Sequence, residues 1–282
     1  MNAELTLLHF AGLPAFGVLI GLLGSVLGVG GGIFMVPFLV LALDVPIHQA
    51  VAVSLAAIVA TSSAVAAVNV ERGLANIRLG ITLEVTTAVG SILGALVAHR
   101  LPANAVQLLF GLTLLPVSGL MFLKGKRSLK AGAAPAAAAG GKATAFDSGF
   151  FDPALNGRTS YGVRNMAPAS FISFFAGSLS GLLGIGGGVV QVPVMNLLCG
   201  VPMKAAAATS NFIIGVSAAA SAYVYFRKGF VPLELTALTV AGVLAGSFIG
   251  IKLLYRARSE KLQIVFSALT LLVALKMLTG AF

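Results

Sequence analysis

Two glycine runs are the most unusual chemical feature of this sequence. Glycines occupy Gly28, Gly30, Gly31 and Gly32, and the same spacing returns at Gly184, Gly186, Gly187 and Gly188. Glycine lacks a Cβ, so such a run can leave helical geometry and turn free backbone N–H groups toward a ligand. A helix that starts after the run adds the positive end of its dipole. The pattern predicts an anion site made mostly of backbone, although close helix packing is the simpler alternative.

Neutral polar side chains follow both runs inside apolar segments. Polar groups are costly in a membrane interior and tend to face a cavity, so these side chains are candidates for substrate binding. They can donate hydrogen bonds without adding charge. Each hydroxyl could instead bond the carbonyls of its own helix. The candidates are Ser54 in the first half of the chain, and Gln191, Asn196, Thr209, Ser210 and Asn211 in the second half.

Ionisable side chains are scarce in the apolar segments. Glu84 is the one carboxylate expected inside a span, where it is a candidate proton carrier or an interfacial residue. His48 and Lys204 follow matched prolines and are candidate cations at a cavity mouth, with snorkelling to the interface as the alternative. The sequence contains no evident catalytic triad, metal cluster or phosphate-binding loop, so we expect no enzyme activity, metal or cofactor.

The elements that position these residues belong to an internal duplication. Val36-Pro37 and Val45-Pro46 match Val192-Pro193 and Val201-Pro202 at the same separation as the glycine runs. The register continues without a gap, pairing Arg100 with Arg256 and other residues that chance would rarely match. We therefore predict two homologous repeats.

Composition places both repeats in a membrane. The chain has 282 residues, of which 58% are hydrophobic and only 9% charged, too few charges to cover a soluble surface. The predicted fold is all-α, with about eight apolar segments, four in each repeat. They are residues 12–43, 48–70, 79–99 and 104–123, followed by 168–199, 204–226, 233–255 and 261–280.

The first segment of each repeat is too long for one crossing. A helix of about 32 residues would extend roughly 48 Å, well beyond a bilayer core near 30 Å. With a glycine run in its middle, each segment is expected to form a re-entrant hairpin. Each repeat then crosses three times, and the two repeats become inverted.

The charges favour this inverted arrangement. The net charge of +10 comes from cations between apolar blocks, which indicates membrane topology and not nucleic-acid binding. Residues 1–123 form the N-terminal repeat, 124–167 a flexible, cytoplasmic linker, and 168–282 the C-terminal repeat. With the linker inside, most cations at the span ends also fall inside, while both termini fall outside.

The doubled pattern resembles the TauE/SafE family of sulfite-exporter-like permeases. The resemblance rests on Gly24-Ser25-Val26-Leu27-Gly28-Val29-Gly30-Gly31-Gly32, on Ser180-Gly181-Leu182-Leu183-Gly184-Ile185-Gly186-Gly187-Gly188, and on Ala208-Thr209-Ser210. Val53-Ser54 departs from the last pattern in the first repeat. The resemblance implies transport of a small sulfur-containing anion.

The leading hypothesis is a secondary transporter in the bacterial inner membrane that exports sulfite, sulfoacetate or another organosulfonate between the repeats. The alternatives are an anion channel and a non-transporting scaffold. The expected partners are the anionic substrate, membrane lipid and a second copy of the chain.

Overall fold

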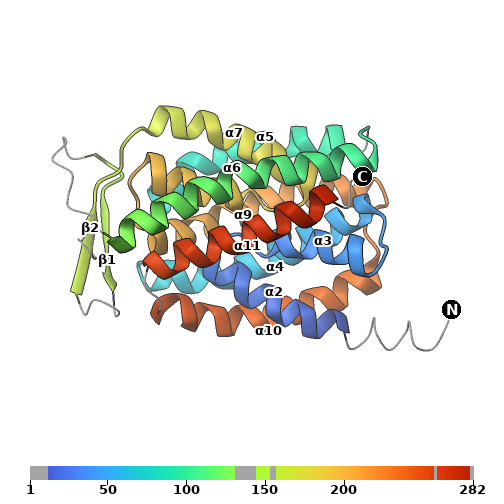
Figure 1. Cartoon of the computed structure of the whole chain (residues 1–282), viewed down its shortest axis with the longest axis horizontal. Helices are drawn as coiled ribbons and strands as arrows, with labels where there is room; N and C mark the ends of the chain where they lie inside the picture. The colour runs from blue at the N-terminus through green and yellow to red at the C-terminus, as the bar shows by residue number, and fades with distance from the viewer. Residues whose placement is uncertain (1–11, 99, 131–143, 153–156, 257–258, 280–282) are drawn as a thin grey trace.

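The computed structural model describes residues 12–98, 100–130, 144–152, 157–256 and 259–279. It is mostly helical, as the apolar segments predict (Figure 1). The first repeat contains α2 (Leu13–Leu27), α3 (Gly32–Ala42), α4 (Ile47–Glu71), α5 (Ile77–Ala98) and α6 (Ala103–Lys130). The second contains α7 (Met166–Leu183), α8 (Gly188–Pro193) with the π-helix η2 (Val194–Leu198), α9 (Met203–Arg227), α10 (Leu233–Arg256) and α11 (Ser259–Thr279).

The first element of each repeat is a folded-back pair of helices. Phe16 of α2 stacks on Phe38 of α3, with ring centroids 3.6 Å apart, so the second arm returns along the first. In the second repeat the Ser173 hydroxyl of α7 donates to the side-chain amide oxygen of Gln191 in α8, at 3.2 Å. Each over-long apolar segment is therefore two antiparallel arms.

The repeats interlock by exchanging these hairpins. The long helix α2 packs along α10 of the other repeat, and α7 packs along α5. Glycines allow this approach: a Cβ on Gly246 would overlap the carbonyl oxygen of Val18, and one on Gly94 would overlap that of Ser178. Small residues at such contacts let helix backbones come close, as in other membrane bundles.

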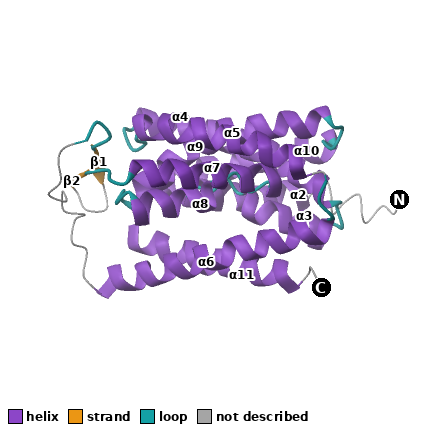
Figure 2. Ribbon diagram, turned by 90° about the horizontal axis from the view of Figure 1, so that it is seen from above, coloured by secondary structure: helices purple, strands orange, loops and turns teal. Residues whose placement is uncertain are grey.

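Three layers result. Figure 2 shows α6 and α11 on one side, α4, α5, α9 and α10 on the other, and the hairpins between them. The middle layer is therefore covered on both faces, which lets irregular backbone persist there without exposure to lipid.

Five of the described helices are long and apolar enough to cross a membrane: α4, α5, α7, α9 and α10. Large apolar side chains on their outer faces are exposed, for example Val85 at 63% and Phe171 at 68%. Exposed apolar side chains of this size fit a lipid environment and not water.

The described part of the segment between the repeats contains two short strands that the sequence did not predict. Helix α6 continues to Lys130, and β1 (Ser148–Asp152) pairs antiparallel with β2 (Gly157–Tyr161). Phe150 and Tyr161 are buried, at 4% exposure each, so this two-stranded sheet packs on the bundle. In Figure 1 it lies at the end opposite to that at which α2 begins and α11 ends. We call these the linker end and the terminal end.

Candidate functional site

The two glycine runs break the hairpins at matched positions. Helix α2 ends in Gly28, which has φ +74°, and α7 ends in Gly184, which has φ +69°. Gly31 and Gly187, directly before α3 and α8, are also left-handed, at φ +87° and +71°. Residues with a Cβ are strained in this region, so glycine is required for the chain to turn back.

The two breaks lie against each other at the centre of the bundle. A Cβ on Gly32 would overlap the carbonyl oxygen of Gly184, and a Cβ on Gly188 would overlap that of Gly28. Helices α3 and α8 therefore begin side by side. Their first N–H groups have no carbonyl one turn earlier in the helix, and they are directed at this contact, which we call the crossing.

Two serines join the crossing reciprocally. Ser54 of α4 donates its hydroxyl to the carbonyl of Gly184 at 2.6 Å, and Ser210 of α9 donates to that of Gly28 at 2.7 Å. Beside them, Asn211 Nδ2 donates to the Ser25 carbonyl at 3.1 Å. The structure thus brings these three predicted residues to the glycine runs. Their donors, however, are occupied by carbonyls, because the crossing is closed and its serines act as clamps between the repeats.

Gln191 and Thr209 lie beside the crossing and bond to α5 or the turn before it. The Gln191 amide donates to Thr87 Oγ at 2.7 Å, and Thr209 Oγ accepts the backbone N–H of Asn76 at 2.9 Å. Asn196 does not join this group. Its Nδ2 donates to the Val201 carbonyl at 2.8 Å, in the turn that ends the hairpin, which is a structural position.

His48 and Lys204 lie at opposite ends of the molecule, because α4 and α9 run in opposite directions. Half-buried His48 contacts Phe230 at the terminal end, with ring centroids 5.6 Å apart. Lys204 is buried at the linker end and forms an ion pair with Asp152 of β1, at 2.6 Å. Lys204, predicted as a cavity-mouth cation, is paired with a carboxylate in this conformation.

Glu84 is buried within α5, at 8% exposure. No described residue forms a hydrogen bond of good geometry with its carboxylate oxygens, although the backbone of Ser217 in α9 interacts with this carboxylate. It lies one turn before Thr87, which holds Gln191, so it belongs to the polar surroundings of the crossing. A buried carboxylate with so little compensation is costly, which favours a functional role for Glu84.

The sequence reasoning missed Asn76, Thr87 and Asp152. Asn76 carries a recognisable signal, because it stands directly before α5 and accepts the N–H of Leu79 at 3.2 Å, as a helix cap does. Asp152 has no such signal, since it lies in the segment expected to be a flexible linker. Within the described residues, no group of three or more His, Cys, Asp or Glu side chains is placed to hold a metal ion.

Comparison with known proteins gives relatives of similar length. The chain is 27% identical to the probable membrane transporter protein YunE of Bacillus subtilis, covering 96% of this chain and 98% of the relative. It is 25% identical to YdhB of the same organism, also a probable membrane transporter protein, over 83% and 86% of the two chains. A probable membrane transporter protein of Methanocaldococcus jannaschii is 24% identical, over 93% and 92%. No solved structure matches the chain.

The family profile described as "Sulfite exporter TauE/SafE" matches residues 13–277. This range includes both glycine runs, the crossing and the serines that clamp it. The apolar helices and the relatives agree on a multi-pass membrane transporter. The chain belongs to the sulfite exporter TauE/SafE family.

Proposed function

We propose that this protein is a secondary carrier that exports a small sulfur-containing anion, such as sulfite, sulfoacetate or another organosulfonate, across the bacterial cytoplasmic membrane. The crossing is the observation that carries the proposal. Two broken hairpins, one from each repeat, meet there backbone to backbone, and Ser54 and Ser210 bridge them reciprocally. The family description supports the choice of substrate class.

The chemistry of the crossing suits an oxyanion. The starts of α3 and α8 supply N–H groups and the positive ends of two helix dipoles, which favour negative charge. Serine and asparagine side chains add neutral donors. An oxyanion that separates the repeats would take the serine hydroxyls in place of the carbonyls of Gly28 and Gly184, so binding and opening are coupled.

The interlocked hairpins provide the moving parts. We infer that each hairpin is re-entrant in the membrane and that the two repeats are inverted. Helix α2 would then move with α10, and α7 with α5, because these pairs have the most extensive packing between the repeats. Rocking one pair against the other would open the crossing first to one side and then to the other, as in other inverted-repeat carriers.

The orientation and the driving force follow from charge. In our assignment the linker end is cytoplasmic, because it carries Arg72, Arg78 and Arg256 beside the strands. An inside-negative potential drives an anion outward by about 2.3 kcal/mol per charge per 100 mV. Export therefore needs no coupling ion.

Flux into proteoliposomes tests the proposal. Purified protein is reconstituted with an imposed potential, and uptake of sulfite, thiosulfate, sulfoacetate and taurine is measured against concentration. We expect saturable uptake of one or more of these compounds. Ser54→Ala and Ser210→Ala should each raise the half-saturation concentration, roughly fivefold, because each removes one neutral donor from the open site.

Ser63→Ala is the matched control. Its hydroxyl is exposed on the same helix as Ser54 and, among the described residues, bonds the Val59 carbonyl of its own helix at 2.7 Å, so its removal should leave the flux unchanged. An absence of saturable, selective uptake across the whole panel would overturn the proposal. Fast uptake that does not saturate would indicate an anion channel.

A further inference from the structure

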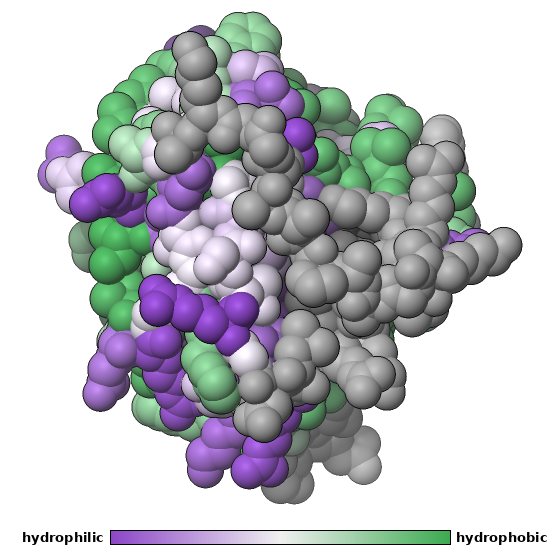
Figure 3. Space-filling view, turned by 90° about the vertical axis from the view of Figure 1, so that its left-hand side faces the viewer, coloured by the Kyte–Doolittle hydropathy of each residue, from purple (hydrophilic) through white to green (hydrophobic). Residues whose placement is uncertain are grey.

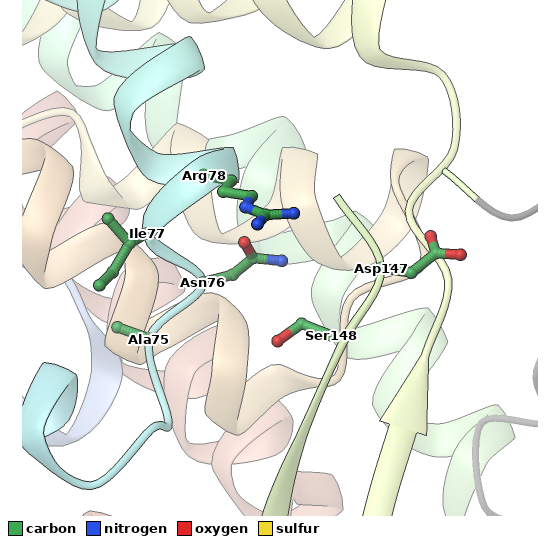
Figure 4. Close-up of a pocket in the computed structure, with 6 residues that line it drawn as sticks. All are labelled: Ala75, Asn76, Ile77, Arg78, Asp147 and Ser148. Atoms are coloured by element: carbon green, nitrogen blue, oxygen red, sulfur yellow. The ribbon is translucent and has the colours of Figure 1, made fainter. Parts of the chain in front are cut away.

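A polar pocket lies at the linker end, outside the crossing. It has a volume of about 220 Å³ and lies between the turn that precedes α5 and the start of β1. Figure 4 shows the side chains of Arg78, Asn76 and Ser148 directed toward the space between these segments. Figure 3 views the molecule from this end, where hydrophilic side chains gather among the described residues.

Hydrogen bonds hold the two walls of the pocket together. Arg78 Nη1 donates to the Ala145 carbonyl at 3.2 Å, and Asn76 Nδ2 donates to that of Phe146 at 2.7 Å. The Tyr161 hydroxyl of β2 interacts with the side chains of Asn76 and Ser148, and burial raises the pKa of this phenol above its ordinary value. The pocket is therefore a built structure and not a gap between loops.

We propose that this pocket is the intake site that captures the anion from the linker side before it reaches the crossing. Within the described residues, Arg78 uses one of its five N–H donors, in the bond to Ala145, which leaves a guanidinium edge for two oxygens of a sulfonate or sulfite. The start of α5, where Asn76 caps the helix, adds the positive end of its dipole. This inference rests on the proposed function.

One acidic residue also lines the pocket. Asp147 opposes an anion by its charge, but Figure 4 shows its carboxylate directed away from Arg78. That carboxylate accepts the backbone N–H groups of Thr144 and Val163, both at 3.0 Å. Its charge is therefore partly compensated by these donors.

A short chain of contacts joins the pocket to the crossing. The backbone N–H of Asn76 donates to Thr209 Oγ. Ser210, which follows Thr209 in α9, donates its hydroxyl to the Gly28 carbonyl. An anion in the pocket thus lies beside the turn before α5. This turn contacts α9 at Thr209, one residue before the serine that clamps the crossing. Capture at Arg78 raises the local concentration of substrate at this entrance.

The duplication does not repeat these pocket residues at the terminal end. In the register of the duplication, Asn76 corresponds to Pro232 and Arg78 to Glu234. Proline has no N–H to donate, and glutamate repels an anion. The pocket described at that end, of about 380 Å³, is lined by Ala, Val, Tyr and Phe residues with no charged side chain. Capture is therefore expected from one side only.

The test measures affinity from each side. Wild-type protein and Arg78→Gln are reconstituted in a single orientation, and the half-saturation concentrations for sulfite and sulfoacetate are determined from the linker side and from the terminal side. Loss of a charge-assisted contact should raise the linker-side value at least about tenfold and leave the terminal-side value unchanged. Arg78→Lys keeps the charge but not the paired N–H donors of the guanidinium. Its linker-side half-saturation concentration should lie between those of wild type and Arg78→Gln.

Arg72→Gln is the matched control. Arg72 lies at the same end, but its guanidinium stacks over Tyr255, 4.8 Å from the ring centroid, and does not line the pocket. We expect its linker-side value to match wild type. Two results would overturn the intake site while leaving the transport proposal intact. One is an equal linker-side half-saturation concentration in wild type and Arg78→Gln, and the other is an equal loss of linker-side affinity in Arg72→Gln and Arg78→Gln.

A binding measurement separates the two proposals if no flux is found. Sulfite and sulfoacetate should raise the melting temperature of the purified wild-type protein more than that of Arg78→Gln. This difference without any flux would support the pocket and overturn the carrier. Equal shifts in both proteins, or no shift in either, would overturn the pocket.

Discussion

The centre and the ends of this molecule differ in how far the two repeats have diverged. The serine clamps of the crossing match: Ser54 and Ser210 make the same bond to opposite breaks. At the ends the repeats do not match, because Lys204 corresponds to His48 and Arg78 to Glu234. A shared crossing suits a site that must serve both sides of a membrane. Different ends suit the one-sided intake proposed above.

The largest expected effect concerns the ion pair at the linker end. Asp152→Ala leaves the Lys204 ammonium buried without its partner, and breaking such a pair costs about 3–5 kcal/mol. We expect a large fall in the melting temperature of the purified protein. The double variant Asp152→Ala/Lys204→Met should recover much of this loss, because no buried charge remains.

His48→Ala is the control for this difference between the ends. His48 occupies the position equivalent to Lys204, but it is only half-buried, so its removal should cost about 1 kcal/mol or less. If Asp152→Ala and His48→Ala destabilise the protein equally, the two ends do not differ in the way described above.

The next effect tests the likeness of the repeats at the crossing. Gly32→Ala and Gly188→Ala each place a Cβ against a carbonyl oxygen of the opposite break, where only backbone can yield. Overpacking of this kind costs about 1–3 kcal/mol, and transport should be lost in both variants. Thermal unfolding and flux measure the two outcomes.

Gly119→Ala in α6 is the matched control, because no atom lies within 4 Å of the added Cβ. This variant should be as stable as wild type or slightly more stable. Clearly unequal losses in Gly32→Ala and Gly188→Ala would contradict an equivalent role of the two breaks.

Beside the crossing, the carboxylate of Glu84 has no acidic counterpart in the second repeat. Glu84 is buried, whereas the equivalent residue of α10 is Val240. If Glu84 carries a proton with the substrate, one pH unit across the membrane is worth about 1.36 kcal/mol, or roughly tenfold accumulation. Glu84→Gln should abolish this pH-driven accumulation while potential-driven flux persists.

Glu234→Gln is the control, since Glu234 is exposed at the terminal end. It should leave the response to pH as it is in the wild type. An unchanged response in Glu84→Gln would remove Glu84 as a proton carrier.

The sequence predicted where the two helices break, but neither the closed contact between the breaks nor its bonds. Doubled glycines in over-long apolar segments indicate where each helix must break, because few other residues accept those dihedral angles. The identity of the bonding partners depends on how the repeats interlock: Ser54 reaches Gly184, 130 positions away. A neutral polar residue within a span has many possible partners, so its type alone could not separate Asn196, which bonds a nearby turn, from Ser210.

The linker was harder to interpret for a different reason. Residues 124–167 lack a long apolar block, and β1 and β2 have only five residues each. Such short strands are stable only when packed on another surface, here the linker end of the bundle. The partner of Lys204 therefore could not be found from the local sequence.

The smallest expected effect lies at the base of this two-stranded sheet. Hydrogen bonds from Thr144 and Val163 hold the pKa of exposed Asp147 below its ordinary value of 3.8. Folding lowers the pKa of Asp147. The contact therefore contributes its full stabilisation at pH values above the ordinary pKa, and this stabilisation is lost as the pH falls through the lowered pKa of the folded protein. Asp147→Asn imitates that loss at neutral pH.

Hydrogen exchange at the Val163 amide measures this effect directly, because that N–H donates to Asp147 Oδ1. We expect exchange to accelerate a few-fold in Asp147→Asn, with the global melting temperature nearly unchanged. Asp44→Asn, in an exposed loop at the terminal end, should leave exchange at Val163 as in wild type. Equal exchange in Asp147→Asn and wild type would mean that the sheet is held by its packing on the bundle alone. The linker end would then keep its shape in acid, and Arg78 would face the same pocket at every pH at which the bundle is folded.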